Sequence, residues 1–374
     1  MEFLQSFDNH LEDMLHRLCV RLQITATQRE LAESRYKSVT EWLAADESTF
    51  WGKDLDIYPQ GSLRIGTTVK PLAHQEFDLD LVCEINRSWQ GKNPLELLNA
   101  MEQRLRLHKT YAPMVQRKNR CIRLNYANEF HMDLLPACPS DSNDSGCLKV
   151  PDREAKDWKD SNPSGYAKWL DDRAKQYETF LEKRASIHPL PDEEPVEFKP
   201  PLKRAVQLIK RHRDICFLDY PNNAPISIVL TTLAGTIYNK QDSVYQTIES
   251  VLSGIISLIP GRGRLIVLNP TNKKEDLSER WDSEPLLYGM FKRYIEDFLK
   301  QWQQLKYARG TELNALIKSL FGEKVTNAVL MEQAMAIEEA RKSSRLRSSW
   351  SLGSLTVLKT SSTPVRRNTF YGED

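Results

Sequence analysis

The order of apolar and polar positions divides the chain into helical and strand-forming stretches. Apolar residues recur at every third or fourth position over residues 3–46, which predicts two amphipathic helices. From Lys199 the helical period returns, and the segment LKRAVQLIKRHRDICFL has one apolar face. We expect that face to carry Leu202, Ala205, Val206, Ile209 and Cys216. Further helices are predicted at residues 225–239, 241–258, 283–308 and 309–319.

Between these helical stretches the period shortens to two, which is typical of β-strands. Residues 77–86, FDLDLVCEIN, have the pattern of a largely buried strand. A hairpin is predicted over residues 121–137, with its turn at residues 127–129. Residues 139–165 are rich in Ser, Asp, Asn, Gly and Pro, and we expect them to form an irregular crossing loop. The chain therefore combines a sheet with helices, and its predicted fold class is α/β.

The composition is that of a globular protein with a sizeable core. The chain has 374 residues, of which 40% are hydrophobic and 28% charged. This length suits one large two-lobed domain or two ordinary ones. Because 52 basic residues balance 51 acidic ones, any site for a polyanion must be local.

No stretch has the pattern of a signal peptide or of a membrane-spanning helix. The six cysteines are scattered without a C-x-x-C pair, which favours a cytoplasmic location and argues against a zinc ribbon. We expect most of them to be core residues. After about Ala340 the chain becomes rich in Ser, Arg and Thr, and we expect a mobile tail.

Three aspartates are the first candidates for chemistry. Asp78 and Asp80 stand two apart on the predicted strand, so both side chains project from the same face. Adjacent carboxylates raise each other's pKa unless a cation neutralises them. Asp133, flanked by apolar residues, adds a third carboxylate if its strand runs beside the first. A D-x-D pair alone is common, but the converging triple indicates an oxygen cage for two Mg²⁺ ions, or Mn²⁺, and a nucleoside triphosphate.

A small-residue turn precedes these carboxylates. Gly61 and Ser62 would let backbone N–H groups approach a polyphosphate, because neither carries a bulky side chain. Ser62 would also cap the helix that we expect to begin near Leu63. A plain helix cap without any ligand is the alternative interpretation of this turn.

The combination GS…DLD…MDLL resembles the polymerase-β-like nucleotidyltransferase superfamily. The segments YPQGSLRIGTTVKPL, LKRAVQLIKRHRD, PISIVLTTLAG and NPTNKKEDLSERW resemble, more narrowly, the bacterial CD-NTases of CBASS anti-phage systems, which are relatives of cyclic GMP–AMP synthase. The resemblance implies a nucleotidyltransferase lobe with a mixed β-sheet, a helical C-terminal lobe, and an active site in the cleft between them. We expect these parts at residues 1–198 and 199–340, with the tail at 341–374.

The resemblance also implies roles for the residues of the first lobe. Gly61 and Ser62 match the positions that bind the triphosphate. Asp78, Asp80 and Asp133 match the metal ligands, and Asp133 also matches the base that helps to deprotonate the attacking ribose hydroxyl.

From the helical lobe, the resemblance implies that Lys203, Lys210 and Ser227 bind the donor's outer phosphates. A solvated helix face is the alternative for the two lysines. For residues 269–272, NPTN, the two interpretations are a lining of the base pocket and a structural turn before a helix, and we favour the turn. For Trp281 we favour a core residue over a stacking platform. The His and Cys spacings do not match the zinc cluster of the animal enzyme, so we expect no device for sensing double-stranded DNA.

The implied activity is the condensation of nucleoside triphosphates, ATP and/or GTP, into a cyclic di- or trinucleotide messenger for anti-phage defence, with release of pyrophosphate. One alternative is a template-free nucleotidyltransferase that makes linear oligonucleotides or modifies an RNA or a protein. Another is a non-catalytic nucleotide-binding scaffold. In some CBASS operons ubiquitin-like conjugating machinery attaches the synthase's C-terminus to other molecules, and the ending RRNTFYGED resembles such a handle.

Overall fold

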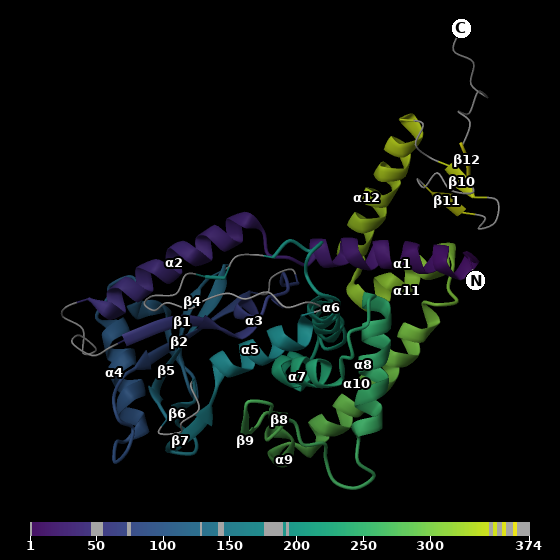
Figure 1. Ribbon diagram of the computed structural model, residues 1–374. Coiled ribbons are helices and arrows are strands. Elements are labelled where there is room, and N and C mark those ends of the chain that lie inside the picture. The colour runs from purple at the N-terminus through teal and green to yellow at the C-terminus, as the bar shows by residue number, and fades with distance from the viewer. Residues whose placement is uncertain are drawn as a thin grey trace.

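The computed structural model contains a lobe built on a β-sheet beside a lobe built on helices (Figure 1). This arrangement confirms the predicted fold class. The structure describes residues 2–45, 55–72, 76–127, 129–140, 146–175, 190–191, 194–343, 347–349, 354–356 and 362–364.

The sheet of the first lobe has seven strands in the order β1-β2-β5-β4-β3, and the hairpin of β6 and β7 extends it from β5. β2 and β5 run parallel, as a convergence of the three aspartates requires. β4 and β5 form the predicted hairpin. The strands are β1 Leu55–Gln60, β2 Phe77–Ile85, β3 Val115–Arg117, β4 Ile122–Tyr126, β5 Phe130–Pro139, β6 Leu148–Asp152 and β7 Asp157–Ser161.

Two helices, α2 (Ala26–Ala44) and α4 (Pro94–Arg106), pack on one face of this sheet and share a buried cluster with it. Leu79 and Leu81 of β2 belong to that cluster and are fully buried. Because side chains alternate along a strand, the intervening carboxylates of β2 point to the opposite face. The apolar pattern of β2 therefore decides which face carries the candidate chemistry.

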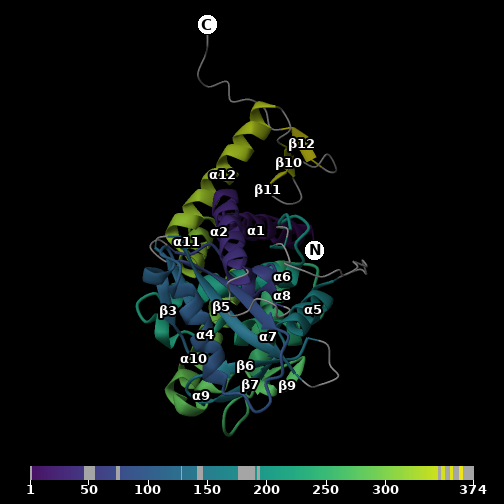
Figure 2. The same cartoon turned by 90° about the vertical axis from the view of Figure 1, so that its left-hand side faces the viewer.

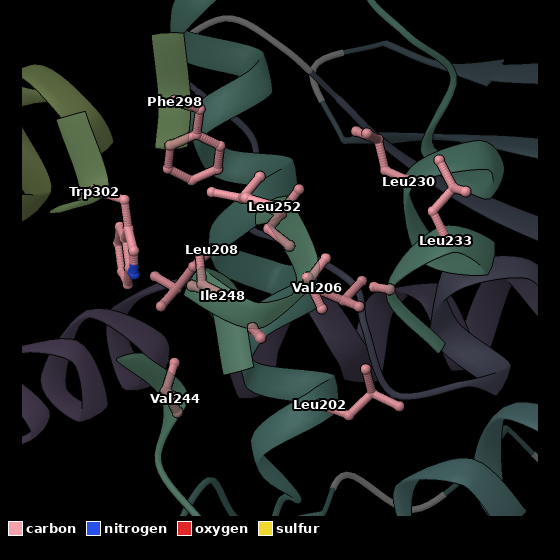
Figure 3. Packing of buried hydrophobic residues seen from close by; sticks show 14 of the residues in the cluster. Leu202, Val206, Leu208, Leu230, Leu233, Val244, Ile248, Leu252, Phe298 and Trp302 are labelled. Carbon is pink, nitrogen blue, oxygen red and sulfur yellow. The ribbon is translucent and has the colours of Figure 1, made fainter. Parts of the chain in front are cut away.

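The second lobe is a helical bundle with a separate buried cluster. Val206, Leu252 and Phe298 come from three different helices and meet in this core (Figure 3). Trp281 is buried in the same cluster, as expected. The helices are α6 Pro201–Cys216, α7 Ser227–Ile237, α8 Val244–Leu258, α9 Arg280–Ser283, α10 Pro285–Gln304, α11 Gly310–Phe321 and α12 Glu323–Lys342.

The N-terminal helix α1 (Glu2–Arg21) lies against the helical lobe, where it packs on α8 and α12 (Figure 1). Its side chains Met14, Leu15 and Leu18 are fully buried in the core of that lobe. The described chain thus starts in the helical lobe, crosses to the sheet, and returns.

The prediction of an irregular loop over residues 139–165 was wrong. This segment holds the β6–β7 hairpin and the start of α5 (Pro163–Ala174). Leu148 and Val150 alternate along β6 and are buried against β2 and β5. Polar and turn-forming neighbours in the sequence hide this short apolar pattern, and tertiary packing overrides their propensities.

Several elements were not anticipated from the sequence, among them β1, β3, α4, α12 and the hairpin of β8 (Leu268–Asn269) with β9 (Asn272–Asp276). Cys216 is exposed, contrary to the expected apolar face, since it stands at the last position of α6. Of the other cysteines, Cys19, Cys83 and Cys138 are buried.

The C-terminal end of the described chain lies beyond α12, which projects from the body of the molecule (Figure 2). There three short strands pair in the order β11-β10-β12. They are β10 Arg347–Ser349, β11 Ser354–Thr356 and β12 Ser362–Pro364. No helix in the described part of the chain is long and apolar enough to cross a bilayer.

Candidate active site

A cavity of about 440 Å³ opens between the two lobes. Its walls come from the sheet and the short helix α3 (Gly61–Arg64) on one side, and from α6, α7 and the β8–β9 hairpin on the other. Residues predicted from the sequence to form the site line it from both lobes: Gly61, Ser62, Asp78, Asp80, Lys210 and Ser227.

Strand register brings the predicted aspartates together. On the parallel pair of β2 and β5, Asp80 lies opposite Asp133, and Asp78 lies opposite His131. Asp78 is more accessible than Asp133, with 53% of its side chain exposed against 15%. From the sequence, Asp133 was expected beside the other two aspartates only if its strand runs next to theirs, and β5 does pair with β2.

An arginine that no motif in the sequence indicates links two of these carboxylates. Arg123 on β4 lies opposite Asp133 and donates two hydrogen bonds to it, Nε to Oδ1 and Nη2 to Oδ2, each at 2.7 Å. Its Nη2 also donates to Asp78 Oδ1 at 3.2 Å. A bidentate guanidinium–carboxylate pair is among the stronger hydrogen-bonded contacts in proteins. Arg123 therefore supplies the positive charge that the clustered carboxylates need.

The electrostatics single out Asp80. Burial raises the pKa of its carboxyl to about 7, and the neighbouring carboxylates of Asp78 and Asp133 add to the rise. Such a like-charge group is chemically suited to a divalent cation, which prefers carboxylate oxygens. In the described part of the chain no three ligand side chains already stand in position around one point, since Asp133 is turned toward Arg123. The donor set fits a metal ion, and Asp133 would exchange contacts with Arg123 to join it.

The turn at Gly61 is fitted closely to Asp80. Gly61 has a φ of +64°, and a Cβ added there would meet Asp80 Oδ2 at 2.1 Å. Only glycine combines that backbone conformation with that approach. Ser62 lies inside α3 rather than capping it, because the helix begins at Gly61. The Ser62 hydroxyl instead forms a hydrogen bond of 3.2 Å with the Thr68 hydroxyl.

The two lysines of α6 have different surroundings. Lys210 lines the cavity, is 7% exposed, and its Nζ donates to the Thr67 carbonyl at 2.9 Å. Lys203 lines a second, smaller cavity, where its Nζ pairs with Asp171 Oδ1 at 3.0 Å. Of the two candidates, the structure brings only Lys210 to the carboxylates.

Two more polar groups complete the helical wall. Ser227 is the first residue of α7, and its hydroxyl accepts a hydrogen bond from Arg213 Nη1. Arg213 itself lines the cavity and stands three residues after Lys210, about one turn further along α6. A search for polar residues one turn after Lys210 would have found it.

One end of the cavity is lined by the β8–β9 hairpin, which contacts β7 of the first lobe. Asn269, expected to be part of a structural turn, is 4% exposed and lines this end together with Glu275. The Asn162 side chain reaches across from the first lobe, with Nδ2 donating to the Thr271 carbonyl at 3.4 Å. Both lobes therefore build this end of the cavity.

Comparison with known proteins gives the family. A domain model described as the Second Messenger Oligonucleotide or Dinucleotide Synthetase domain matches residues 10–174. The chain is 36% identical over 378 residues to a c-di-GMP synthase of Roseivirga ehrenbergii, a match that covers 97% of each protein. This chain belongs to the bacterial CD-NTase family. As a CD-NTase it is a nucleotidyltransferase that synthesises cyclic oligonucleotides.

A second relative and its structure extend the comparison. The chain is 25% identical over 351 residues to the cyclic dinucleotide synthase CdnG of Bradyrhizobium diazoefficiens, covering 85% of this CD-NTase and 82% of that protein. The structure of the Bradyrhizobium CD-NTase CdnG in complex with GTP matches with a TM-score of 0.72 and 23% identity, over 86% of this chain and 98% of that one. This likeness establishes the two-lobed fold.

Proposed function

We propose that this CD-NTase condenses purine nucleoside triphosphates, GTP among them, into a cyclic dinucleotide that acts as a cytoplasmic second messenger in anti-phage defence. The proposal is carried by one observation: Asp80 and Asp133 lie opposite each other on parallel strands, beside a cavity that also holds Lys210. The names of the relatives, a c-di-GMP synthase and a cyclic dinucleotide synthase, support the base and the ring size.

The proposed roles follow from the chemistry of each group. Asp78, Asp80 and Asp133 would hold divalent cations, Mg²⁺ or Mn²⁺, which neutralise phosphate charge and stabilise the leaving pyrophosphate when bound. Gly61 and Ser62 offer an unobstructed backbone to the triphosphate.

Charge on the helical side has a complementary role. Lys210 and Arg213 would bind the donor's outer phosphates, together with the Ser227 hydroxyl. Positioning and charge neutralisation supply most of what phosphoryl transfer requires, because the transition state needs little covalent help.

Asp133 is the proposed base. It would accept the proton of a ribose hydroxyl, whose oxygen attacks the donor's α-phosphorus while the bond between the α-phosphorus and the bridging oxygen breaks. Arg123 holds both Asp133 oxygens and fixes the orientation of that carboxylate before the nucleotides bind. The linear product would then turn over in the cavity, and a second transfer of the same kind would close the ring.

The test is product analysis. The purified protein is incubated with all four labelled nucleoside triphosphates and Mg²⁺ or Mn²⁺, and the products are treated with phosphatase and identified by mass. Products that resist phosphatase and have the mass of a cyclic dinucleotide are expected. Linear products alone would favour a template-free nucleotidyltransferase, and nucleotide binding without any product would favour a scaffold.

A matched pair of variants ties the product to the site. Asp80→Asn should abolish product, because a neutral amide is a poor ligand for a divalent cation. Asp172→Asn, at a position on α5 with 52% of the side chain exposed, should leave product unchanged.

A further inference from the structure

Glu275 is a carboxylate in the cavity that the proposed chemistry does not use. It lies on β9, lines the cavity, and is partly buried. Burial raises the pKa of its carboxyl, while the hydrogen bond from Asn269 acts in the opposite direction. Within the described part of the chain no lysine or arginine forms an ion pair with it. Glu275 therefore does not serve as half of an internal salt bridge there.

The orientation of Glu275 is fixed by Asn269. The Asn269 Oδ1 accepts hydrogen bonds from the Thr271 backbone N–H and the Thr271 hydroxyl, each at 3.0 Å. These two contacts make Nδ2 the free end of the amide, and it donates to Glu275 Oε2 at 2.7 Å. A carboxylate held in this way by a buried amide is preorganised before a ligand arrives.

The surroundings of Glu275 suit the flat face of a base. Tyr166, Ile228 and Leu277 line the same cavity and offer aromatic and aliphatic surface. A cavity with apolar walls and a few fixed polar groups is the usual form of a small-molecule site. The residues proposed to bind the triphosphate therefore line the same cavity as Glu275, and this cavity also has apolar surface for the base.

The hydrogen-bonding pattern of the nucleobases decides which base fits. An ionised carboxylate only accepts hydrogen bonds. Guanine presents two adjacent donors, N1–H and the N2 amino group, on its Watson–Crick edge. Adenine presents an acceptor at N1, which faces the lone pairs of a carboxylate unfavourably. Asn269 occupies part of Oε2 and leaves the remaining lone pairs of the carboxylate for a ligand.

We propose that Glu275 reads the Watson–Crick edge of guanine and makes this CD-NTase select GTP over ATP, an inference that rests on the proposed function. Asn269 acts as a positioning residue for the carboxylate. A site built to pair with polar groups of one base discriminates strongly against a base that leaves those groups unpaired.

The experiment replaces the carboxylate by an amide of the same size. The parent and Glu275→Gln receive equal concentrations of labelled GTP and ATP, and the guanine-to-adenine ratio in phosphatase-resistant product is measured by mass. We expect the ratio to fall about tenfold or more, because the Gln amide would turn a donor toward a guanine donor. Glu338→Gln is the matched control, with the same chemical change on α12, outside the cavity lining, where 51% of the side chain is exposed; it should keep the parental ratio.

Binding provides a readout that does not depend on turnover. Titration calorimetry with non-hydrolysable GTP and ATP analogues should give the same loss of guanine preference in Glu275→Gln. If the Gln variant does not fold, Glu275→Asp is measured in its place, since the shorter carboxylate loses its reach to the base. A variant that folds and keeps the parental preference overturns the inference.

The outcomes separate the two proposals. A parent that makes no cyclic product contradicts the proposed function. A parent that makes a cyclic product free of guanine, or a Glu275→Gln enzyme that cyclises with an unchanged guanine ratio, contradicts the role of Glu275 alone.

Discussion

Asp80 carries a carboxyl group whose pKa is raised from 3.8 to about 7. In the metal-free protein its proton stabilises the folded state fully below the unfolded pKa, and that contribution is lost as pH rises through about 7. Asp80→Asn cannot ionise, so its melting temperature should exceed the parent's near pH ~8, with the gap closing as pH falls toward ~4. Thermal melts in a chelator across this range measure the gap.

Asp172→Asn is the control for these melts, because its side chain is largely exposed on α5. It should follow the parent at every pH. An Asp80→Asn protein that melts below the parent even at the alkaline end would show that the Asp80 charge is not repelled in the folded state.

The close approach of Gly61 to Asp80 can be tested by substitution, with Gly91 as a matched control position. Gly61 and Gly91 have nearly the same φ, +64° and +65°, but an added Cβ meets Asp80 only at Gly61. Both alanine variants should lose roughly 1 kcal/mol of unfolding free energy from the left-handed backbone. Only Gly61→Ala should also lose nucleotide binding and product, because its methyl displaces the Asp80 carboxylate. Chemical denaturation and a triphosphate titration separate the two effects, and equal product from both variants would remove Gly61 from the site.

The carboxylates were predictable from the sequence, whereas Arg123, the arginine that binds two of them, was not. A D-x-D pair on an apolar strand fixes the face from its own spacing. Arg123 reaches Asp133 through strand register, a relation between β4 and β5 that no local pattern in the sequence specifies. Glu275 could not be predicted as a cavity residue for the same reason. It lines the cavity because its hairpin packs against β7, a contact between elements far apart in the sequence.

At the scale of one helix, α6 carries two lysines one heptad apart with different expected effects. Lys210 lines the cavity and Lys203 does not. Lys210→Met keeps the packing volume and removes the charge, so it should weaken binding of a non-hydrolysable triphosphate about tenfold or more. Lys203→Met should change that affinity by about twofold at most, because its partner is Asp171 on the protein itself. Equal losses in both variants would contradict this division.

The same helix predicts a pH dependence. Burial, and then the charge of Arg213, lower the pKa of Lys210 to about 8. A triphosphate binds the charged amine, so donor affinity should be highest below about pH 8 and fall as pH rises through that value. In Lys210→Met this decline should disappear, which calorimetric titrations at several pH values would reveal.

Helices and strands differ in how well they can be predicted from the sequence. The long helices of the second lobe were predictable because an apolar stripe repeats over many turns, as in α8 and α10. β6 and the β8–β9 hairpin were not, because they are short and their composition is that of a loop. Their stability comes from packing against β5 and β7, so only the tertiary structure reveals them.

The residues of the candidate active site come from both lobes of the molecule. The carboxylates and the Gly61 turn belong to the sheet, while Lys210 and Glu275 belong to the helical lobe. Both ends of the cavity therefore depend on the lobes keeping their relative position. α1 connects the two lobes, because its side chains pack in the helical core and the chain that follows it enters the sheet lobe.

The C-terminal end can be tested separately from the catalytic cavity. Residues 366–374 lie outside the described residues, and the three short strands before them stand beyond α12, away from the cavity lining (Figure 2). Deleting residues 366–374 should therefore leave cyclase activity of the purified protein within about twofold of the parent. In cells we expect the deletion to abolish conjugates and phage protection, because the aromatic side chains of Phe370 and Tyr371 are suited to binding in a partner's groove. Phe370→Ala with Tyr371→Ala keeps the length and tests the aromatic contacts separately. Loss of activity in the tube would place the tail in the catalytic machinery, and full protection by the deletion would leave it without the proposed role.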